Sequence, residues 1–347
     1  MENIAVKLFG CLLLCLCCGC NSNSSKTEKY QNRRDHIIHV REKVKEINME
    51  DALIGSIARL YLVHDYLIIS DHSSNSELIH IFDRNNFNYI RCMAYKGQGP
   101  GEIANLGHIE AGKNRRFYVT DHGKQKIFDY DIDSILTNPL YMPDVKMTLN
   151  VEFFPDRYRY IDDTLSIGLI IKPIRNSGFD QSVAKINFST GEIKPMPYNH
   201  PDIERKRVCF AASAEHDLFV ECYHYHDLMT VCSLNGDLKH NIYGGKWDDR
   251  MTNKFAYYEK VVFCNDKIVA SFSEGKEQFS NYNNRYPSEN RYPTQFLVFN
   301  TKGDYIRTLE TGYSILDFCY DKDNNRIIMI LNAEMQFAYL DLNGLME

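Results

Sequence analysis

The sequence lacks the short motifs that mark several large classes of enzyme. It contains no GxSxG nucleophile elbow, no HExxH zinc motif and no GxxxxGK[ST] loop, so nothing in it points to an α/β-hydrolase, a zinc peptidase or a P-loop nucleotidase. It also lacks a block of lysines and arginines, and its 347 residues carry a formal net charge of −6. Proteins that bind nucleic acid usually have a basic face, so nucleic acid is not expected as a partner.

Closely spaced cysteine pairs of the kind that bind zinc are missing after residue 20. Five of the 11 cysteines lie within the first 20 residues. The other six are scattered, mostly inside apolar runs, and we expect buried free thiols that pack as small hydrophobic side chains. In an exported protein a pair among them remains able to oxidise. These six are Cys92, Cys209, Cys222, Cys232, Cys264 and Cys319.

The apolar run at residues 8–20 is too short for a comfortable transmembrane helix, and after a basic residue it is typical of a secretory signal. Its last two residues, Gly19 and Cys20, resemble a bacterial lipobox, although Cys17 stands where leucine is usual and Cys18 is a competing site. We expect acyl chains on Cys20 to hold the protein at a membrane without a spanning helix. The alternative is an ordinary cleaved signal peptide.

What the chain does contain is the composition of a folded β protein. Hydrophobic residues make up 44% and charged residues 25%, which suits a globular domain with a substantial core. The 23 tyrosines and 19 phenylalanines belong to residue types that are enriched in strands. We expect a signal peptide at residues 1–20, a polar tether at 21–34 and a single β domain at 35–347.

Short apolar runs rich in β-branched and aromatic residues recur along this domain. The clearest set is Tyr66–Asp71, Leu78–Asp83 and Tyr89–Tyr95, each followed by turn-forming residues. Four such runs make a unit, and a glycine that supplies a positive φ joins the third run to the fourth. Two of these glycines, Gly191 and Gly236, are 45 residues apart. A period of about 40–50 residues with four strands each is typical of propeller blades.

Six units can be counted, which predicts an all-β, six-bladed β-propeller with four antiparallel strands per blade. The fourth strand of the second unit, near Leu140, is poorly defined, and the sixth unit lacks its last strand. We expect the isolated apolar run Asp35–Val40 to supply that strand, so that an N-terminal strand closes the ring in the last blade. A seven-bladed ring and a pair of β-sandwiches are the alternatives.

A glycine-rich corner follows the first unit. No helix follows it to bind a phosphate, so a nucleotide loop is not indicated, and we expect a tight crossing between two blades. The residues of this structural corner are Gly97, Gly99, Pro100, Gly101 and Glu102.

The corner, the preceding segment Ala52–Gly55 and the lipobox together resemble the TolB-like, NHL-related six-bladed propeller lipoproteins of Gram-negative bacteria. The resemblance covers essentially the whole mature chain, although the later units match only in general pattern. It implies the propeller fold and a protein anchored by lipid to the outer membrane, on the periplasmic or the surface side. The family carries no established catalytic residues, so no activity is implied.

Strand order places the candidate binding residues on one face of the propeller. In an antiparallel blade, the loop between the second and third strands lies on the same face as the connection to the next blade. The loops of this face hold the most distinctive residues, and loops on a rigid scaffold often carry function. The candidates are Asp71, His72, Asp121, His122, Arg175, His224, His226, Tyr282, Arg285, Tyr286, Arg291 and Tyr292.

The long insertion Glu274–Thr294 lies on the same face. It repeats the sequence Asn-Arg-Tyr-Pro at residues 284–287 and 290–293. Tyrosine and arginine are favoured at interfaces, and proline stiffens a loop. The insertion is therefore either a recognition loop or a surface insertion whose tyrosines pack on the neighbouring blade.

Histidines and aspartates on this face make a metal site conceivable. His224 and His226 share one side of the strand if it continues, and Asp227 follows them. Aspartate at a strand end more often caps a turn, so neither a metal nor another cofactor is expected.

These observations favour a membrane-anchored binding or scaffold protein of the cell envelope, with a glycan, a peptide or an envelope protein as its partner. One alternative is a propeller enzyme, a glycan lyase or hydrolase or a lactonase-like protein, with its site at the channel mouth. Another is a structural subunit of an envelope complex.

Overall fold

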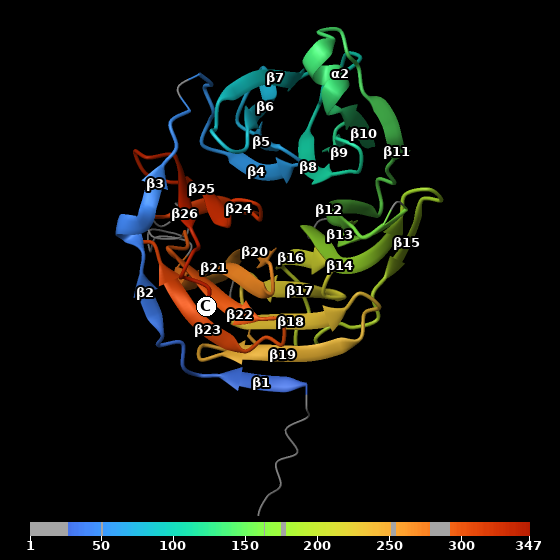
Figure 1. Ribbon diagram of the computed structural model, residues 1–347. Coiled ribbons are helices and arrows are strands. Elements are labelled where there is room, and N and C mark those ends of the chain that lie inside the picture. Colours follow the sequence, from blue (N-terminus) through green and yellow to red (C-terminus); the bar gives the residue numbers. More distant parts are fainter. Residues whose placement is uncertain (1–26, 50, 163, 175–177, 251–254, 278–291) are drawn as a thin grey trace, which may run out of the picture.

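Six β-sheets are arranged as blades around a central axis, as Figure 1 shows. The computed structural model describes residues 27–49, 51–162, 164–174, 178–250, 255–277 and 292–347. Each blade is an antiparallel four-stranded meander, and two blades gain a fifth strand at the outer edge. The predicted all-β, six-bladed propeller is confirmed.

The first three blades, from the inner to the outer strand, are β4 (Ala58–Val63), β5 (Tyr66–Asp71), β6 (Glu77–Asp83) and β7 (Tyr89–Tyr95); β8 (Leu106–Ala111), β9 (Arg116–Asp121), β10 (Lys126–Asp131) and β11 (Asp144–Thr148); and β12 (Phe154–Tyr160), β13 (Leu165–Ile174), β14 (Gly178–Asn187) and β15 (Glu192–Pro195). The other three are β16 (Val208–Ser213), β17 (Leu218–Tyr223), β18 (Leu228–Ser233) and β19 (Leu238–Gly244); β20 (Phe255–Cys264), β21 (Lys267–Glu277), β22 (Gln295–Asn300) and β23 (Tyr305–Glu310); and β24 (Ile315–Asp321), β25 (Arg326–Leu331), β26 (Phe337–Asp341) and β3 (Val44–Glu46).

The core lies between neighbouring blades. Every residue of β18 and of β25 is buried, because the blades on either side cover both faces of these middle strands. Phe296 of the fifth blade and Phe318 of the sixth pack edge to face with ring centroids 4.8 Å apart. Burial of a phenylalanine side chain stabilises the fold by about 1.5–3 kcal/mol, so such contacts hold the blades together.

The ring is closed by an N-terminal strand in the last blade, but the strand is not the predicted one. β3 pairs antiparallel with β26, whereas β2 (Ile37–His39) pairs parallel with β23 of the fifth blade. The prediction that Asp35–Val40 supplies this strand is therefore wrong. Asp35–Val40 has a stronger apolar pattern than Val44–Glu46, which is why it was predicted, but it lies at the edge of the fifth blade. Val40 is fully buried, and a short 3-10 helix, η1 (Arg41–Lys43), then leads the chain to the sixth blade.

Part of the predicted polar tether at residues 21–34 is also a strand. β1 (Glu28–Gln31) pairs parallel with β19, and Tyr30 stacks on Tyr243 with ring centroids 4.8 Å apart. The segment is polar because it lies at the outer edge of the fourth blade, where its side chains are only partly buried and hydrogen-bond to polar groups such as the Gly303 carbonyl oxygen. The N-terminal segment thus runs along the edges of three blades in turn, shown in blue in Figure 1.

The second blade contains an element that the sequence did not indicate. A short helix, α2 (Ile132–Thr137), follows β10 and is capped by the Asp131 carboxylate, which accepts a hydrogen bond from the Ser134 amide at 2.7 Å. The outer strand β11 begins only at Asp144, after the exposed Leu140. The helix displaces the fourth strand along the sequence, which explains why its position near Leu140 was poorly defined.

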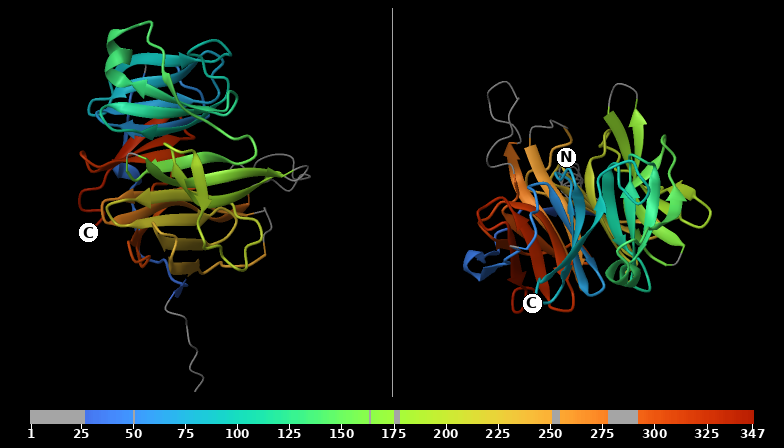
Figure 2. Two further views of the ribbon diagram at one scale, coloured as in Figure 1. Left: turned by 90° about the vertical axis from the view of Figure 1, so that its right-hand side faces the viewer. Right: turned by 90° about the horizontal axis from the view of Figure 1, so that it is seen from above.

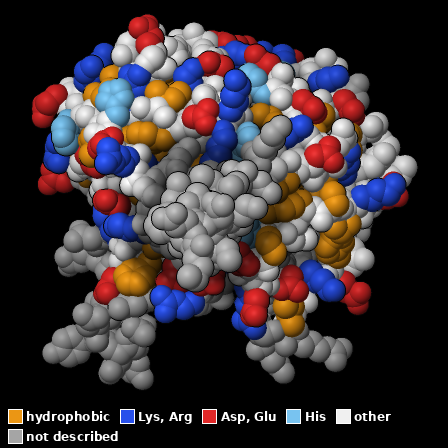
Figure 3. Space-filling view, turned by 90° about the horizontal axis from the view of Figure 1, so that it is seen from below, with side chains coloured by type: hydrophobic (Ala, Val, Ile, Leu, Met, Phe, Trp, Pro, Cys, Tyr) orange, Lys and Arg blue, Asp and Glu red, His pale blue; other side chains and the backbone are white. Residues whose placement is uncertain are grey.

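The two faces of the disc differ. β13, β14, β20 and β21, with 10 or 11 residues each, are the longest of the described strands, and they extend beyond the disc on one face (Figure 2). Where the disc is seen edge-on in Figure 3, acidic and basic side chains are interspersed over the part of the rim that is not covered by grey atoms. Neither helical segment of the described chain has the length and hydrophobicity needed to cross a bilayer.

Candidate functional site

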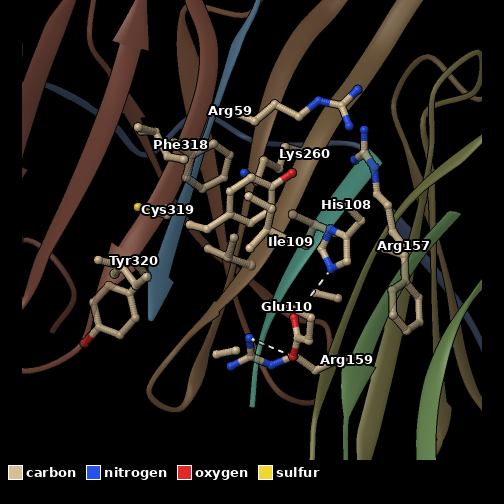
Figure 4. Close-up of a pocket in the computed structure, with 18 of the residues that line it drawn as sticks. Arg59, His108, Ile109, Glu110, Arg157, Arg159, Lys260, Phe318, Cys319 and Tyr320 are labelled. Carbon is tan, nitrogen blue, oxygen red and sulfur yellow. Dashed lines mark ion pairs between the residues drawn. The ribbon is translucent and has the colours of Figure 1, made fainter. Parts of the chain in front are cut away.

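A cavity of about 260 Å³ lies on the propeller axis (Figure 4). The first strand of each blade is the innermost, and all six of these strands, β4, β8, β12, β16, β20 and β24, contribute to its lining. The volume is close to the lower end of the range of about 300–1,000 Å³ that small-molecule sites occupy. A small ligand, or the terminal unit of a longer one, fits such a space.

Two ion pairs bind neighbouring blades together inside this cavity. The Lys260 Nζ atom lies 2.7 Å from Asp317 Oδ1, and the other carboxylate oxygen accepts a hydrogen bond from the Leu60 amide at 2.7 Å. Asp317 therefore connects the fifth, sixth and first blades. Because both of its oxygens have a donor, its charge is balanced within the protein.

The second ion pair is on the opposite wall. Glu110 lies 3.4 Å from Arg159 and 3.5 Å from the His108 ring, and its carboxylate accepts a hydrogen bond from the Tyr160 amide at 3.2 Å. His108 Nε2 also lies 2.9 Å from the backbone carbonyl oxygen of Tyr158. These contacts join the second blade to the third and balance the charge of Glu110.

Two further arginines at the cavity, Arg59 and Arg157, have no carboxylate as close as those of Lys260 and Arg159 within the described part of the chain. Arg59 has no carboxylate within 4.0 Å among the residues that the structure describes, and the nearest carboxylate of Arg157 is that of Asp156, at 3.9 Å. Figure 4 shows the two guanidinium groups pointing toward one another. The nearby Tyr61 has a raised pKa, chiefly because of burial.

A second pocket, of about 200 Å³, adjoins the cavity on the loop face between the third, fourth and fifth blades. Arg157 lines both spaces, so it forms part of the wall between them. The predicted residue His224 lines this pocket, with Nδ1 at 3.0 Å from the Tyr258 carbonyl oxygen and 3.4 Å from Glu259. Arg207 and Tyr225 complete its polar rim.

The predicted binding residues Asp71 and Asp121 are structural. The Asp71 carboxylate accepts hydrogen bonds from the Gly55 amide at 2.7 Å and from the amide and hydroxyl of Ser73. Burial opposes ionisation of Asp71, but these hydrogen bonds outweigh it and lower its pKa. Asp121 likewise accepts from four backbone amides, those of Ala104, Asn105, Gly123 and Lys124.

His72 and His122 lie beside the basic end of the cavity. His72 Nε2 is 3.0 Å from the Ser70 hydroxyl, and burial together with the positive charge of Arg59 lowers the pKa of His72 to about 4. Burial also lowers the pKa of His122, which lies 3.9 Å from Asp156. Both rings are therefore neutral at neutral pH and add no positive charge to that of the arginines.

His226 is buried away from both spaces. Its Nδ1 atom is 2.9 Å from the Asp248 carbonyl oxygen, and its ring packs near Trp247. Burial lowers its pKa. No cluster of three or more histidines, cysteines or carboxylates within the described ranges has the spacing of a metal site.

The glycine-rich corner connects β7 to β8. The Glu102 carboxylate accepts a hydrogen bond from the Gly99 amide at 2.7 Å, and Lys124 Nζ donates to the carbonyl oxygens of both residues at 2.7 Å. A Cβ atom at Gly97 would lie 2.0 Å from a Glu102 oxygen, and Gly101 has a φ of +74°. The corner, which also includes Pro100, is thus fastened to the second blade.

Several predicted residues fall outside the described part of the chain. Tyr292 is described and is half-buried at the end of the insertion, before β22. Those outside the described residues are Cys20, Arg175, Tyr282, Arg285, Tyr286 and Arg291.

The charged residues of the cavity were missed because the candidates were sought in loops. Arg59, Arg157 and Lys260 lie within the first strand of their units, and each is followed by an apolar or aromatic residue. A charged residue inside an otherwise apolar strand is unusual unless that position faces water or a partner. Its recurrence in the first strand of several units was the signal that could have revealed a polar cavity on the axis.

Comparisons with known proteins support the same fold. A protein-family model described as a 6-bladed beta-propeller matches residues 47–164, about a third of the chain. None of the curated proteins matches the sequence.

Several solved structures share the fold at low sequence identity. A member of the DUF4221 family from Bacteroides vulgatus is 11% identical, with a TM-score of 0.56 over 86% of this chain and 95% of its own. A protein described as exported, from Bacteroides fragilis, is 10% identical, with a TM-score of 0.54 over 90% and 98% of the two chains. The extracellular domain of a hybrid two-component system from B. thetaiotaomicron is 13% identical, with a TM-score of 0.50 over 84% of this chain and 34% of that one. At such identities the likeness concerns the fold alone.

Proposed function

We propose that this protein is a binding protein of the cell envelope that takes its ligand at the loop-face end of the axial cavity. The observation that carries the proposal is a charged cavity joined on that face to a second polar pocket, with Arg157 between them. A concave site with a few converging polar groups on a rigid scaffold is the usual form of a ligand site. The ligand class is a glycan, a peptide or a segment of an envelope protein.

The proposed location is based on the lipobox-like sequence ending at Cys20 and on the resemblance to TolB-like, NHL-related lipoproteins. Two propellers of similar fold are described as exported or extracellular, which supports a position outside the cytoplasm. The proposal places the protein at the outer membrane, anchored by lipid.

Replacing Cys20 with serine tests the anchor. We expect the variant to move from the membrane fraction to the soluble fraction, because the thiol that would carry the acyl chains is gone. The measurement is an immunoblot of the two fractions, with Cys18→Ser as the matched control. An unchanged membrane fraction in Cys20→Ser cells would contradict lipidation at this residue.

Filling the cavity tests the binding site. Ala211 of β16 lines the cavity, so Ala211→Phe should reduce its volume and weaken by about tenfold or more any ligand found by screening the purified protein against envelope glycans and peptides. Lys322→Ala on the opposite face, where Lys322 is exposed and pairs with Glu215 at 3.2 Å, is the control. Equal binding by both variants and the unaltered protein would place the ligand elsewhere.

A second candidate function is that of a propeller enzyme, because His108 and Glu110 lie together in the cavity at 3.5 Å. A histidine and a carboxylate in contact are able to act together in general acid–base catalysis. Turnover of a glycan or a lactone that Glu110→Gln abolishes would favour this candidate. Constant co-purification with one partner would instead favour a structural subunit of an envelope complex.

A further inference from the structure

The geometry points to an oxyanion receptor formed by Arg59 and Arg157, so that the ligand of the axial cavity carries a carboxylate, sulfate or phosphate group. This inference deepens the proposed function and rests on it.

Not all charged side chains of the cavity are paired with one another. The cavity lining contains four basic side chains, Arg59, Arg157, Arg159 and Lys260, and two carboxylates, Glu110 and Asp317. Each carboxylate is already paired, Glu110 with Arg159 and Asp317 with Lys260. Of the other two basic side chains, Arg59 has no carboxylate partner among the described residues, and Arg157 has only Asp156, which lies 3.9 Å away and lines the adjoining pocket.

An arginine without a carboxylate partner at the cavity has an unfavourable electrostatic free energy. Removing a charge from water without a partner is unfavourable. Arg59 has no carboxylate within 4.0 Å in the described ranges. Arg157 is 33% exposed, and although burial lowers its pKa, the charge of Asp156 at 3.9 Å outweighs this effect and raises it, so Arg59 is the less compensated of the two. An anionic ligand would provide the missing counter-charge.

The guanidinium groups of the two arginines converge from different blades. Arg59 is on β4 and Arg157 on β12, and their guanidinium groups point toward one another (Figure 4). Guanidinium groups bind carboxylates, sulfates and phosphates through parallel N–H···O hydrogen bonds. Two of them held by different blades form a preorganised clamp, which lowers the entropic cost of binding.

Aromatic side chains and a second pocket are available to the part of the ligand beyond its anionic group. Tyr61 and Phe210 line the cavity and are half-buried, so a ring beside the acidic group would contact aromatic surfaces. The adjoining 200 Å³ pocket begins at Arg157. The two spaces suit an anionic terminal unit in the cavity and its next unit in the pocket.

A series of probes with one common ring tests this inference. Calorimetric titration of the purified full-length protein would use D-glucuronate, glucose 6-sulfate and glucose 6-phosphate as anionic probes, and D-glucose as the neutral ring. We expect at least one anionic probe to bind at least about tenfold more tightly than glucose, and increasing salt to weaken it. The strongest of the three identifies the oxyanion.

Variants then locate the site. Arg59→Gln and Arg157→Gln should each weaken the best anionic probe by about tenfold or more, and Arg59→Lys should restore part of the affinity because the charge returns without the planar fork. Arg33→Gln, at an exposed position of the N-terminal segment, should have no effect. Thermal unfolding of each variant controls for loss of the fold.

The outcomes separate this inference from the proposed function. If glucose or a neutral envelope ligand binds in the cavity and Ala211→Phe blocks it, while no anionic probe binds more tightly, the oxyanion receptor is wrong and the binding function stands. If an anionic probe binds equally well to Arg59→Gln and Arg157→Gln, the receptor is also wrong. If neither neutral nor anionic ligands bind, both proposals fail.

Discussion

Replacing Arg34 with alanine should lower the free energy of unfolding by about 3–5 kcal/mol. Arg34 lies between β1 and β2, and its guanidinium is buried with Nη1 at 2.7 Å from Asp227 Oδ1. Burial alone would lower the pKa of Arg34, but Tyr258 and Asp227 outweigh it and raise the pKa. The variant leaves the Asp227 carboxylate buried without its cation, and removing one partner of a buried pair is strongly destabilising.

The measurement is urea unfolding followed by fluorescence, with Lys29→Ala as the matched control. Lys29 is in the same N-terminal segment and lies 2.7 Å from Asp304, whose side chain is 54% exposed. An exposed pair contributes about 0–1 kcal/mol, so this change should be small. Equal losses in the two variants would mean that the buried pair does not hold the N-terminal segment on the blades.

The second large effect is expected from a charge introduced where the ring closes. Val40 is fully buried and packs with core residues of the fifth and sixth blades, among them Leu309, Phe318 and Leu340. Val40→Asp places an unpaired carboxylate in this core, and we expect a loss of at least about 3 kcal/mol with a large decrease in soluble protein.

Ile37→Asp is the matched control for Val40→Asp, because Ile37 belongs to the same segment but its side chain is half exposed. We expect this variant to stay within about 1 kcal/mol of the unaltered protein. Thermal unfolding monitored by circular dichroism measures both. A Val40→Asp protein with the same melting temperature as Ile37→Asp would contradict the role of this residue in closing the ring.

Most of the fold could be predicted because each unit carries its own signals. The turn glycines Gly191, Gly236, Gly303 and Gly344 all have the expected positive φ, between +70° and +92°. Strands buried on both faces read as apolar runs whatever their partner is. The N-terminal strands were harder to predict, because Val44–Glu46 contains a single apolar residue and its pairing with β26 depends on a segment almost 300 residues away.

The site was harder to predict than the fold for a related physical reason. Of the candidates, His224 lines the second pocket. His72 and His122 line neither space, although the charge of Arg59 contributes, after burial, to their lowered pKa values. The arginines that face each other come from units about 100 residues apart. They come close because the ring of blades places the inner strands of the first and third blades around one axis. No local sequence pattern encodes that arrangement. Asp71 and Asp121 are candidates because they belong to the loops of one face of the disc, but each stands at the end of a strand, where its carboxylate accepts hydrogen bonds from backbone amides.

The path of the N-terminal segment bears on how the disc would stand at a membrane. The described chain begins at residue 27 on the rim of the fourth blade, next to β19. If Cys20 carries a lipid, six residues lie between it and residue 27, and the seven steps from one to the other span at most about 25 Å. The attachment would then be on the rim of the disc, at the fourth blade, so that neither end of the axial cavity is the point of anchorage.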